Sequence, residues 1–192
     1  MTKDDLWVFG YGSLMWRPGF DFLEQRPAML YGYYRSLCVF SHVHRGTPEK
    51  PGLVFGLDRG GSCRGLAFRV AAANGEKVKD YLRRREQVTM IYLEMMVPLR
   101  LLDSSPRTTK ALCFIVDRAH QQYAGKLDFA HQVELIANGK GQSGDNPDYL
   151  ENMIMHLKER GIKDAGLERL WQAVAQRLEI TEHGARSANP SR

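Results

Sequence analysis

The sequence is poor in cysteine and has no long apolar run. Its three cysteines, Cys38, Cys63 and Cys113, are widely spaced, and each lies beside apolar residues. An odd number at such spacing does not suit a disulfide framework or a zinc site, and it favours a reducing cytoplasm. No stretch approaches the length needed to cross a bilayer, and the first residues show no secretory signal pattern. We therefore expect a cytoplasmic protein without a membrane partner.

A concentrated basic segment is also missing. The formal net charge is +5, from 27 Lys and Arg against 22 Asp and Glu. The densest basic cluster, at 83–85, is followed at once by Glu86, and neither a basic tail nor an aromatic–basic module is present. We therefore expect no nucleic-acid partner. A modest positive charge suits the capture of a small acidic substrate.

Familiar catalytic signatures are absent as well. There is no Gly-x-Ser-x-Gly elbow and no glycine-rich lysine loop for phosphates. Ser62 and Cys63 follow two glycines, which favours a tight connection over a nucleophile on a turn. His42 and His44 are two residues apart, as ligands on one side of a strand would be, but no third ligand stands nearby. A structural role is the favoured interpretation, and no metal site is expected.

The 192 residues, 43% of them apolar, are enough for one domain with a sizeable core. We expect a single domain over 1–180 and a disordered tail over 181–192. Strands followed by helices indicate an α+β fold, with a mixed or antiparallel sheet, curled into a partial barrel, and flanking helices. The pattern predicts strands over 6–9, 28–40, 53–57, 63–70, 91–101 and 111–116, and helices over 75–87, 128–137, 148–160 and 164–178.

The most informative feature lies at the amino terminus. The apolar run 6–9 predicts a buried strand, and Gly10, Tyr11, Gly12 and Ser13 follow it directly. Glycines at this spacing allow positive φ and a close approach to another group, while successive amides can converge on an anion. Ser13 adds a hydroxyl donor. The alternative is an ordinary tight turn after a strand.

A carboxylate stands where the helix over 75–87 should be apolar. Val78 and Leu82 are four residues apart on one stripe, and Glu86 is the next position on it. Burial raises the pKa of a carboxyl group toward the range that suits proton transfer at neutral pH. One interpretation is a general base aimed into a pocket. The other is a frayed helix end, with Glu86 in solvent or paired with Arg83 or Arg85.

Several motifs in order resemble the glutathione-specific γ-glutamylcyclotransferases, the ChaC-like family, over roughly residues 6–170. The matching stretches are VFGYGSLMW at 8–16, RSLC at 35–38, HRGTPEKPGL at 44–53, GGSCRG at 60–65, YLRRRE at 81–86, NPDYL at 146–150 and LKERGIKD at 157–164. The resemblance implies a γ-glutamylcyclotransferase-like fold. It also implies cleavage of glutathione to 5-oxoproline and cysteinylglycine, without cofactor or metal.

The resemblance also implies roles for individual residues. Glu86 corresponds to the catalytic acid/base. The substrate-binding residues it implies are Val8, Phe9, Gly10, Tyr11, Gly12, Ser13, Leu14, Arg35 and Tyr149, with Arg45 as a further arginine candidate. Tyr149 follows a segment that departs from the family pattern, so it is either a substrate contact or a packing residue. Two alternatives stay open: a cyclotransferase for other γ-glutamyl amines or amino acids, and a binding module that kept the pocket.

Overall fold

The structure is a computed structural model that describes residues 4–103 and 106–187, with the side chains of 180–187 excepted. The chain forms two compact units. The first comprises the residues up to Val39 together with Phe55–Tyr123, and the second comprises Phe40–Val54 and the residues from Ala124 onward.

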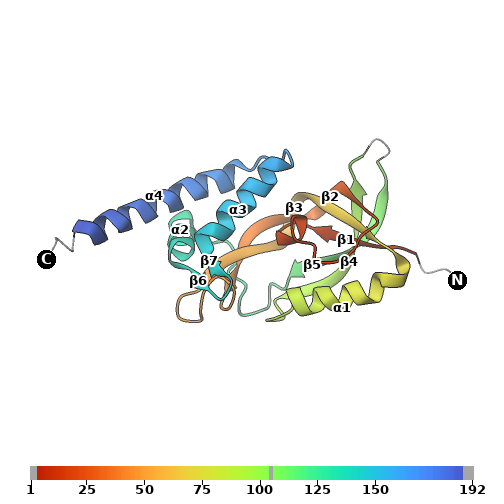
Figure 1. The fold of residues 1–192 in the computed structure, drawn as a ribbon, viewed down its shortest axis with the longest axis horizontal. Coiled ribbons are helices and arrows are strands. Elements are labelled where there is room, and N and C mark those ends of the chain that lie inside the picture. The colour runs from red at the N-terminus through yellow and green to blue at the C-terminus, as the bar shows by residue number, and fades with distance from the viewer. Residues whose placement is uncertain (1–3, 104–105, 188–192) are drawn as a thin grey trace. The chain divides into compact units, whose positions relative to one another are not determined.

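A closed barrel of five strands forms the first unit, with the strand order β1-β3-β2-β4-β5 (Figure 1). The strands are β1 (Leu6–Gly10), β2 (Glu24–Ser41), β3 (Gly52–Val70), β4 (Tyr92–Leu101) and β5 (Thr108–Val116), of which β2 and β3 also reach into the second unit. Strand β1 is antiparallel to β3 and parallel to β5, where Trp7 pairs with Ala111. The expected α+β fold with a mixed sheet is confirmed, and the barrel is fully closed.

Strand β3 corrects one prediction. We expected two strands, over 53–57 and 63–70, joined by a tight connection, but Gly52–Val70 is one continuous strand. Gly60 and Gly61 take φ of 112° and 58° in its middle. This left-handed backbone favours glycine, so the pair permits an irregularity within the strand. Ser62 and Cys63 therefore lie inside a strand and not on a turn.

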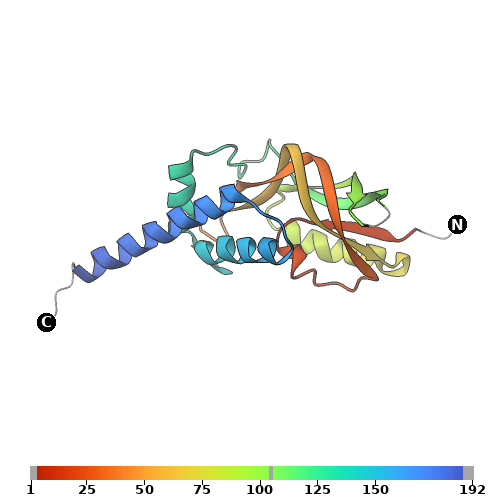
Figure 2. The ribbon, with the colours of Figure 1, turned by 90° about the horizontal axis from the view of Figure 1, so that it is seen from above.

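The helix α1 (Gly75–Glu86) runs beside the barrel strands and carries the candidate carboxylate at its last residue (Figures 1 and 2). Val78 and Leu82 are buried, at 4% and 0% exposure, as the stripe predicts. Asn74 occupies the N-cap position of α1, but its side chain makes no capping hydrogen bond. The short 3-10 helix η2 (Ala72–Asn74) leads directly into α1, and the amide of Gly75 donates to the carbonyl of Ala72.

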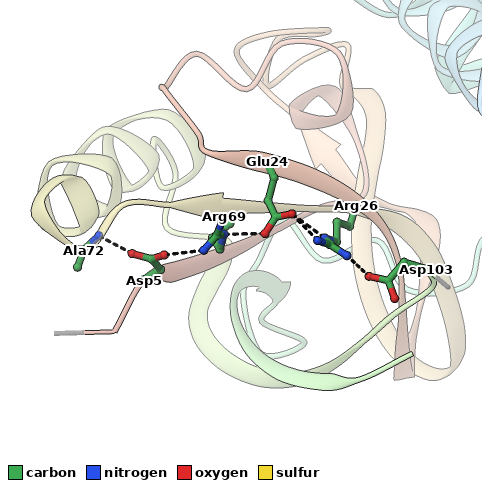
Figure 3. A network of polar contacts seen from close by, with 6 residues as sticks. All are labelled: Asp5, Glu24, Arg26, Arg69, Ala72 and Asp103. Carbon is green, nitrogen blue, oxygen red and sulfur yellow. Dashed lines mark hydrogen bonds and ion pairs between the residues drawn. The ribbon is translucent and has the colours of Figure 1, made fainter. Parts of the chain in front are cut away.

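A chain of alternating charges connects the ends of the barrel strands (Figure 3). Asp5 pairs with Arg69 at 3.1 Å, Arg69 with Glu24 at 2.6 Å, and Glu24 with Arg26 at 2.7 Å; Arg26 also pairs with Asp103. These residues come from the segment before β1, the end of β3, the start of β2 and the segment after β4. A partly exposed pair contributes about 0–1 kcal/mol. These ion pairs therefore fix how the strand ends meet more than they stabilise the barrel.

The second unit contains three helices that pack on one another: α2 (Phe129–Asn138), α3 (Asn146–Glu159) and α4 (Ala165–Ser187). Between α2 and α3 lies a hairpin of β6 (Lys140–Gly141) and β7 (Gly144–Asp145). Asp128 caps α2, because its side chain accepts a hydrogen bond from the His131 amide at 2.9 Å. None of the helices in the described part of the chain has the length and apolarity that a bilayer crossing requires.

Two boundaries in this unit differ from the sequence prediction. Helix α3 begins at Asn146, two residues before the predicted start at residue 148, and its N-cap is Asp145. Asn146 is fully buried, and its amide exchanges two hydrogen bonds with the backbone of Leu53, at 2.6 and 3.0 Å. Helix α4 continues to Ser187, although we expected disorder from residue 181. The remainder of that expected tail, 188–192, lies outside the described residues.

Candidate functional site

The glycine loop begins where β1 ends and turns at once into the short helix η1 (Ser13–Met15). The amides of Met15 and Arg17 donate to the carbonyls of Gly12 and Ser13, both at 2.9 Å. Neither glycine adopts the positive φ that this spacing allows: Gly12 has φ −127°, and Gly10 is not among the positive-φ glycines. The two glycines therefore serve through the absence of a side chain and not through a left-handed backbone.

The two glycines differ in what surrounds them. A Cβ on Gly10 would lie 3.1 Å from both the Leu14 Cβ and the Phe68 ring, so Gly10 is required for packing. A Cβ on Gly12 would meet no atom within 4 Å. In the described part of the chain, no acceptor is recorded for the amides of Gly12, Ser13 and Leu14. The loop thus has open space at Gly12 and, within the described residues, three neighbouring amides for which no acceptor is seen.

Other predicted binding residues support this loop from the barrel. The side chains of Val8, Phe9 and Leu14 are buried at 0%, 1% and 5% exposure, so they pack the core beneath the loop. Any contact from Val8 or Phe9 to a ligand would have to come from the backbone. Tyr11 is also buried, at 7% exposure, with its ring 6.5 Å from that of Phe9.

Arg35 on β2 fixes the backbone of the loop. Its Nε donates to the carbonyl of Tyr11 at 2.6 Å, and its Nη2 donates to the carbonyl of Arg64 at 2.8 Å. The same Nη2 lies 3.8 Å from the sulfur of Met15. The guanidinium therefore ties β2, β3 and the loop together. Sequence reasoning identified Arg35 as a substrate contact, which stays a prediction, but it missed this supporting role.

Glu86 lies at the carboxyl end of α1 on the stripe that Val78 and Leu82 bury. Its side chain is 19% exposed, so the carboxylate is largely withdrawn from water. Burial raises the pKa of Glu86 above its ordinary value, and the positive charge of Arg85 opposes that rise. Of the alternatives left open by the sequence, a carboxylate in bulk solvent does not apply, whereas an ion pair with Arg85 is present.

Arg85 connects Glu86 with the glycine loop. Its Nε lies 3.2 Å from Glu86 Oε1, and its Nη2 donates to Ser13 Oγ at 3.0 Å. Its Nη1 donates to the carbonyls of Arg17 and Pro18, at 2.5 and 3.2 Å. One guanidinium thus touches both the candidate acid/base and the hydroxyl of the loop.

The end of the loop packs tightly against α1 at Gly19. This residue has φ 73°, and a Cβ there would lie 2.0 Å from the phenol oxygen of Tyr81. Both the left-handed backbone and the close approach require glycine. The Tyr81 phenol in turn accepts a hydrogen bond from Arg85 Nη1 at 3.0 Å. The segment from Gly12 to Gly19 is therefore held against the carboxyl end of α1.

Tyr149 and Arg45 lie together in the second unit. The Arg45 guanidinium stands 5.3 Å from the centre of the Tyr149 ring, and its Nη1 donates to the carbonyl of Asp145 at 3.0 Å. His44, in the same segment, shares a 3.0 Å hydrogen bond with Ser143, and the His42 ring stacks on Phe40. Structural contacts thus account for both histidines.

The three cysteines are buried free thiols. Burial raises the pKa of Cys38 to about 12, so its reactive thiolate form is disfavoured at neutral pH. No group of three or more His, Cys, Asp or Glu residues in the described ranges is arranged to hold a metal ion. The chemistry that the first unit offers is a partly buried carboxylate, a hydroxyl and a row of backbone donors.

Comparison with known proteins gives a consistent result. A model of the ChaC-like protein family matches residues 6–177. The glutathione-specific gamma-glutamylcyclotransferase of Escherichia coli is 35% identical over 173 residues, covering 90% of this chain and 74% of that protein. The human glutathione-specific gamma-glutamylcyclotransferase 1 is 33% identical, covering 90% and 80%.

The fold is similar to that of a solved relative. The crystal structure of a yeast gamma-glutamyl cyclotransferase specific to glutathione superposes with a TM-score of 0.82 at 22% identity, covering 90% of this chain and 96% of that one. At that identity the likeness concerns the fold alone. The predicted γ-glutamylcyclotransferase-like fold is thereby confirmed.

Proposed function

Because the chain belongs to the ChaC-like family, we propose that it is a glutathione-specific γ-glutamylcyclotransferase. It converts glutathione to 5-oxoproline and cysteinylglycine and, on this proposal, needs no metal or cofactor. The observation that carries the assignment is the pairing of a largely buried Glu86 with a glycine loop through one guanidinium.

The substrate supplies its own nucleophile in this reaction. The α-amine of the γ-glutamyl group attacks the γ-amide carbonyl and forms a new C–N bond that closes a five-membered ring. The bond to the cysteine nitrogen then breaks, and that nitrogen takes up a proton to leave as the free amine of cysteinylglycine. The absence of a Ser or Cys nucleophile motif is consistent with this chemistry.

Glu86 moves the proton. The α-amine of the substrate is largely protonated at neutral pH and must lose a proton before it can attack. The carboxylate of Glu86 accepts that proton and then delivers one to the leaving nitrogen. A positioned acid/base of this kind contributes about 10²–10⁴-fold to the rate. The raised pKa of Glu86 suits both roles, because a group whose pKa lies nearer the working pH can both accept and release a proton.

The glycine loop holds the γ-glutamyl end of the substrate. The amides of Gly12, Ser13 and Leu14 and the hydroxyl of Ser13 bind the α-carboxylate, which folds the chain so that the amine meets the carbonyl carbon. Backbone donors of the same loop stabilise the oxyanion of the tetrahedral intermediate. Support for this role comes from the open space at Gly12 and from the lack of a recorded acceptor for these amides among the described residues.

Two wider assignments accompany this one. Residues 1–180 act as a single functional domain, since the family model spans 6–177 and so includes parts of both units. The cytoplasm suits the protein because its three thiols are free and buried. Tyr149 remains a predicted substrate contact, and Tyr149→Phe tests it: an unchanged KM for glutathione would assign it to packing against Arg45.

The experiment compares Glu86→Gln with Glu76→Gln, which changes a 63% exposed carboxylate in the first turn of the same helix. Release of 5-oxoproline from glutathione is measured for each purified variant. We expect Glu86→Gln to lose at least about 100-fold in kcat, in line with removal of a general base, and Glu76→Gln to match the parent. Near-parent activity of Glu86→Gln would refute the assignment.

A second substrate separates the two cyclotransferase alternatives. The parent protein is assayed with γ-glutamyl-alanine beside glutathione under the same conditions. Turnover of glutathione alone supports the proposed specificity. A preference for γ-glutamyl-alanine would replace it with the broader cyclotransferase. Release of 5-oxoproline from neither substrate would identify a binding module.

A further inference from the structure

The guanidinium of Arg85 makes more hydrogen bonds and ion pairs than a simple surface ion pair would. Its side chain is 22% exposed, and its three nitrogens contact five groups. These are the Glu86 carboxylate, the Ser13 hydroxyl, the Tyr81 phenol and the carbonyls of Arg17 and Pro18. The neighbouring Arg84 is exposed and has no recorded partner among the described residues. The contrast shows that α1 directs one arginine of its last turn inward.

We propose that Arg85 is a positioning residue for the cyclisation, which holds the carboxylate of Glu86 and the hydroxyl of Ser13 in a fixed relation to each other. This inference rests on the proposed function, in which Glu86 moves the proton and the loop binds the α-carboxylate. Arg85 itself acts through these two groups and not on the reacting atoms.

The planar guanidinium fork explains why an arginine suits this position. Its Nε faces Glu86, while Nη1 and Nη2 lie on the side that meets the loop and Tyr81. Arginine offers five N–H donors in a rigid arrangement, whereas lysine offers three donors at one point. A lysine at this position would keep the positive charge but would not reach the carboxylate and the loop at once.

The contact with Ser13 also sets the direction of its hydroxyl. Because Ser13 Oγ accepts a hydrogen bond from Arg85 Nη2, the oxygen has a fixed donor on that side. The hydroxyl hydrogen is then left to donate elsewhere. A ligand carboxylate at the open side of the loop is the acceptor that the proposed function supplies.

The contact with Glu86 opposes the effect of burial on the pKa of that carboxylate. Burial raises the pKa of Glu86, and Arg85 is the one charged group recorded as lowering it within the described part of the chain. Arg83 on the same helix is directed to Glu94 and Asp80, and Arg17 on the loop contributes its carbonyl. Removing the Arg85 charge therefore raises the pKa of Glu86 further, and the base form is reached at higher pH.

The test measures kcat/KM for glutathione against pH in Arg85→Met and Arg85→Lys, with Arg84→Met as the matched control one residue earlier on the helix. We expect Arg85→Met to lose on the order of 10- to 100-fold, as misplacement of reacting groups does, and its acid limb to move to higher pH. Arg85→Lys should return the acid limb toward the parent position without restoring the rate. Arg84→Met should match the parent in both respects.

Four outcomes decide between the possibilities. A fall in rate and melting temperature with an unmoved acid limb overturns the inference, because a purely structural role predicts it. If Arg85→Met fails to fold, Arg85→Lys decides, and parent activity in that variant overturns the inference. If Arg85→Met matches the parent while Glu86→Gln is inactive, the inference fails and the proposed function stands. Parent activity in Glu86→Gln would remove the proposed function itself.

Discussion

Gly10 and Gly12 lie two residues apart, and the structure predicts opposite consequences for replacing them. A Cβ on Gly12 meets no atom within 4 Å. Gly12→Ala should therefore leave the free energy of unfolding within about 0.5 kcal/mol of the parent, as surface substitutions do. The new methyl group would occupy the space assigned to the γ-glutamyl end of glutathione, so KM should rise.

At Gly10 the added Cβ would lie 3.1 Å from the Leu14 Cβ and from the Phe68 ring. Inserting a methyl group into a packed core costs about 1–3 kcal/mol. At about 2–4 °C per kcal/mol for a chain of this size, Gly10→Ala should lower the melting temperature by about 2–12 °C. The pair separates a packing glycine from a ligand-facing one within a single loop.

The assay combines a thermal melt with steady-state release of 5-oxoproline over a range of glutathione concentrations. Gly12→Val extends the series, and its larger side chain should raise KM further or abolish turnover. If Gly12→Ala and Gly12→Val both fold and their KM values stay at the parent value, the α-carboxylate binds elsewhere. A melting temperature for Gly10→Ala equal to that of the parent would show that Leu14 and Phe68 yield without cost.

Two further predictions concern stability. Because the folded-state pKa of Glu86 lies above its unfolded value, the folded state binds more protons at pH values between these two pKa values, and stability falls as pH rises through that window. Glu86→Gln should therefore melt at or above the parent temperature at pH 7. A lower melting temperature would indicate a structural role for Glu86. In the second unit, Asn146→Leu leaves the buried N–H and C=O of Leu53 without their hydrogen-bond partner, which costs about 1–3 kcal/mol for each group. Chemical denaturation should therefore show a free energy of unfolding lower by at least about 2 kcal/mol.

Helix periodicity, which is local, placed Glu86 on the apolar stripe of α1 but left open whether that helix end frays into solvent. Val78, Leu82 and Glu86 recur at four-residue intervals, and the structure buries the first two and largely withdraws the third. Apolar runs, which are also a local signal, predicted β1 and β5, and both strands lie in the barrel wall. The function of Glu86 did not follow from periodicity, since the same pattern allowed a frayed end.

What sequence reasoning missed depends on contacts between distant segments. Arg35 reaches the Tyr11 carbonyl 24 positions away, and Arg85 reaches the Ser13 hydroxyl 72 positions away. No spacing rule encodes such contacts. Glycine also misled the prediction: Gly60 and Gly61 indicated a turn, but the neighbouring strands kept the segment in the sheet and left only a local irregularity. Tertiary pairing outweighed the local turn preference there.

The parallel pairing of β1 with β5 has a consequence for biosynthesis. Trp7 leaves the ribosome well before its partner Ala111, which is translated more than a hundred codons later. The barrel cannot close before β5 is made, and contacts of such sequence separation slow folding. Until β5 is made, the side of β1 that pairs with β5 is therefore an unpaired edge. An unpaired edge of this kind is a template for pairing with another chain during that interval.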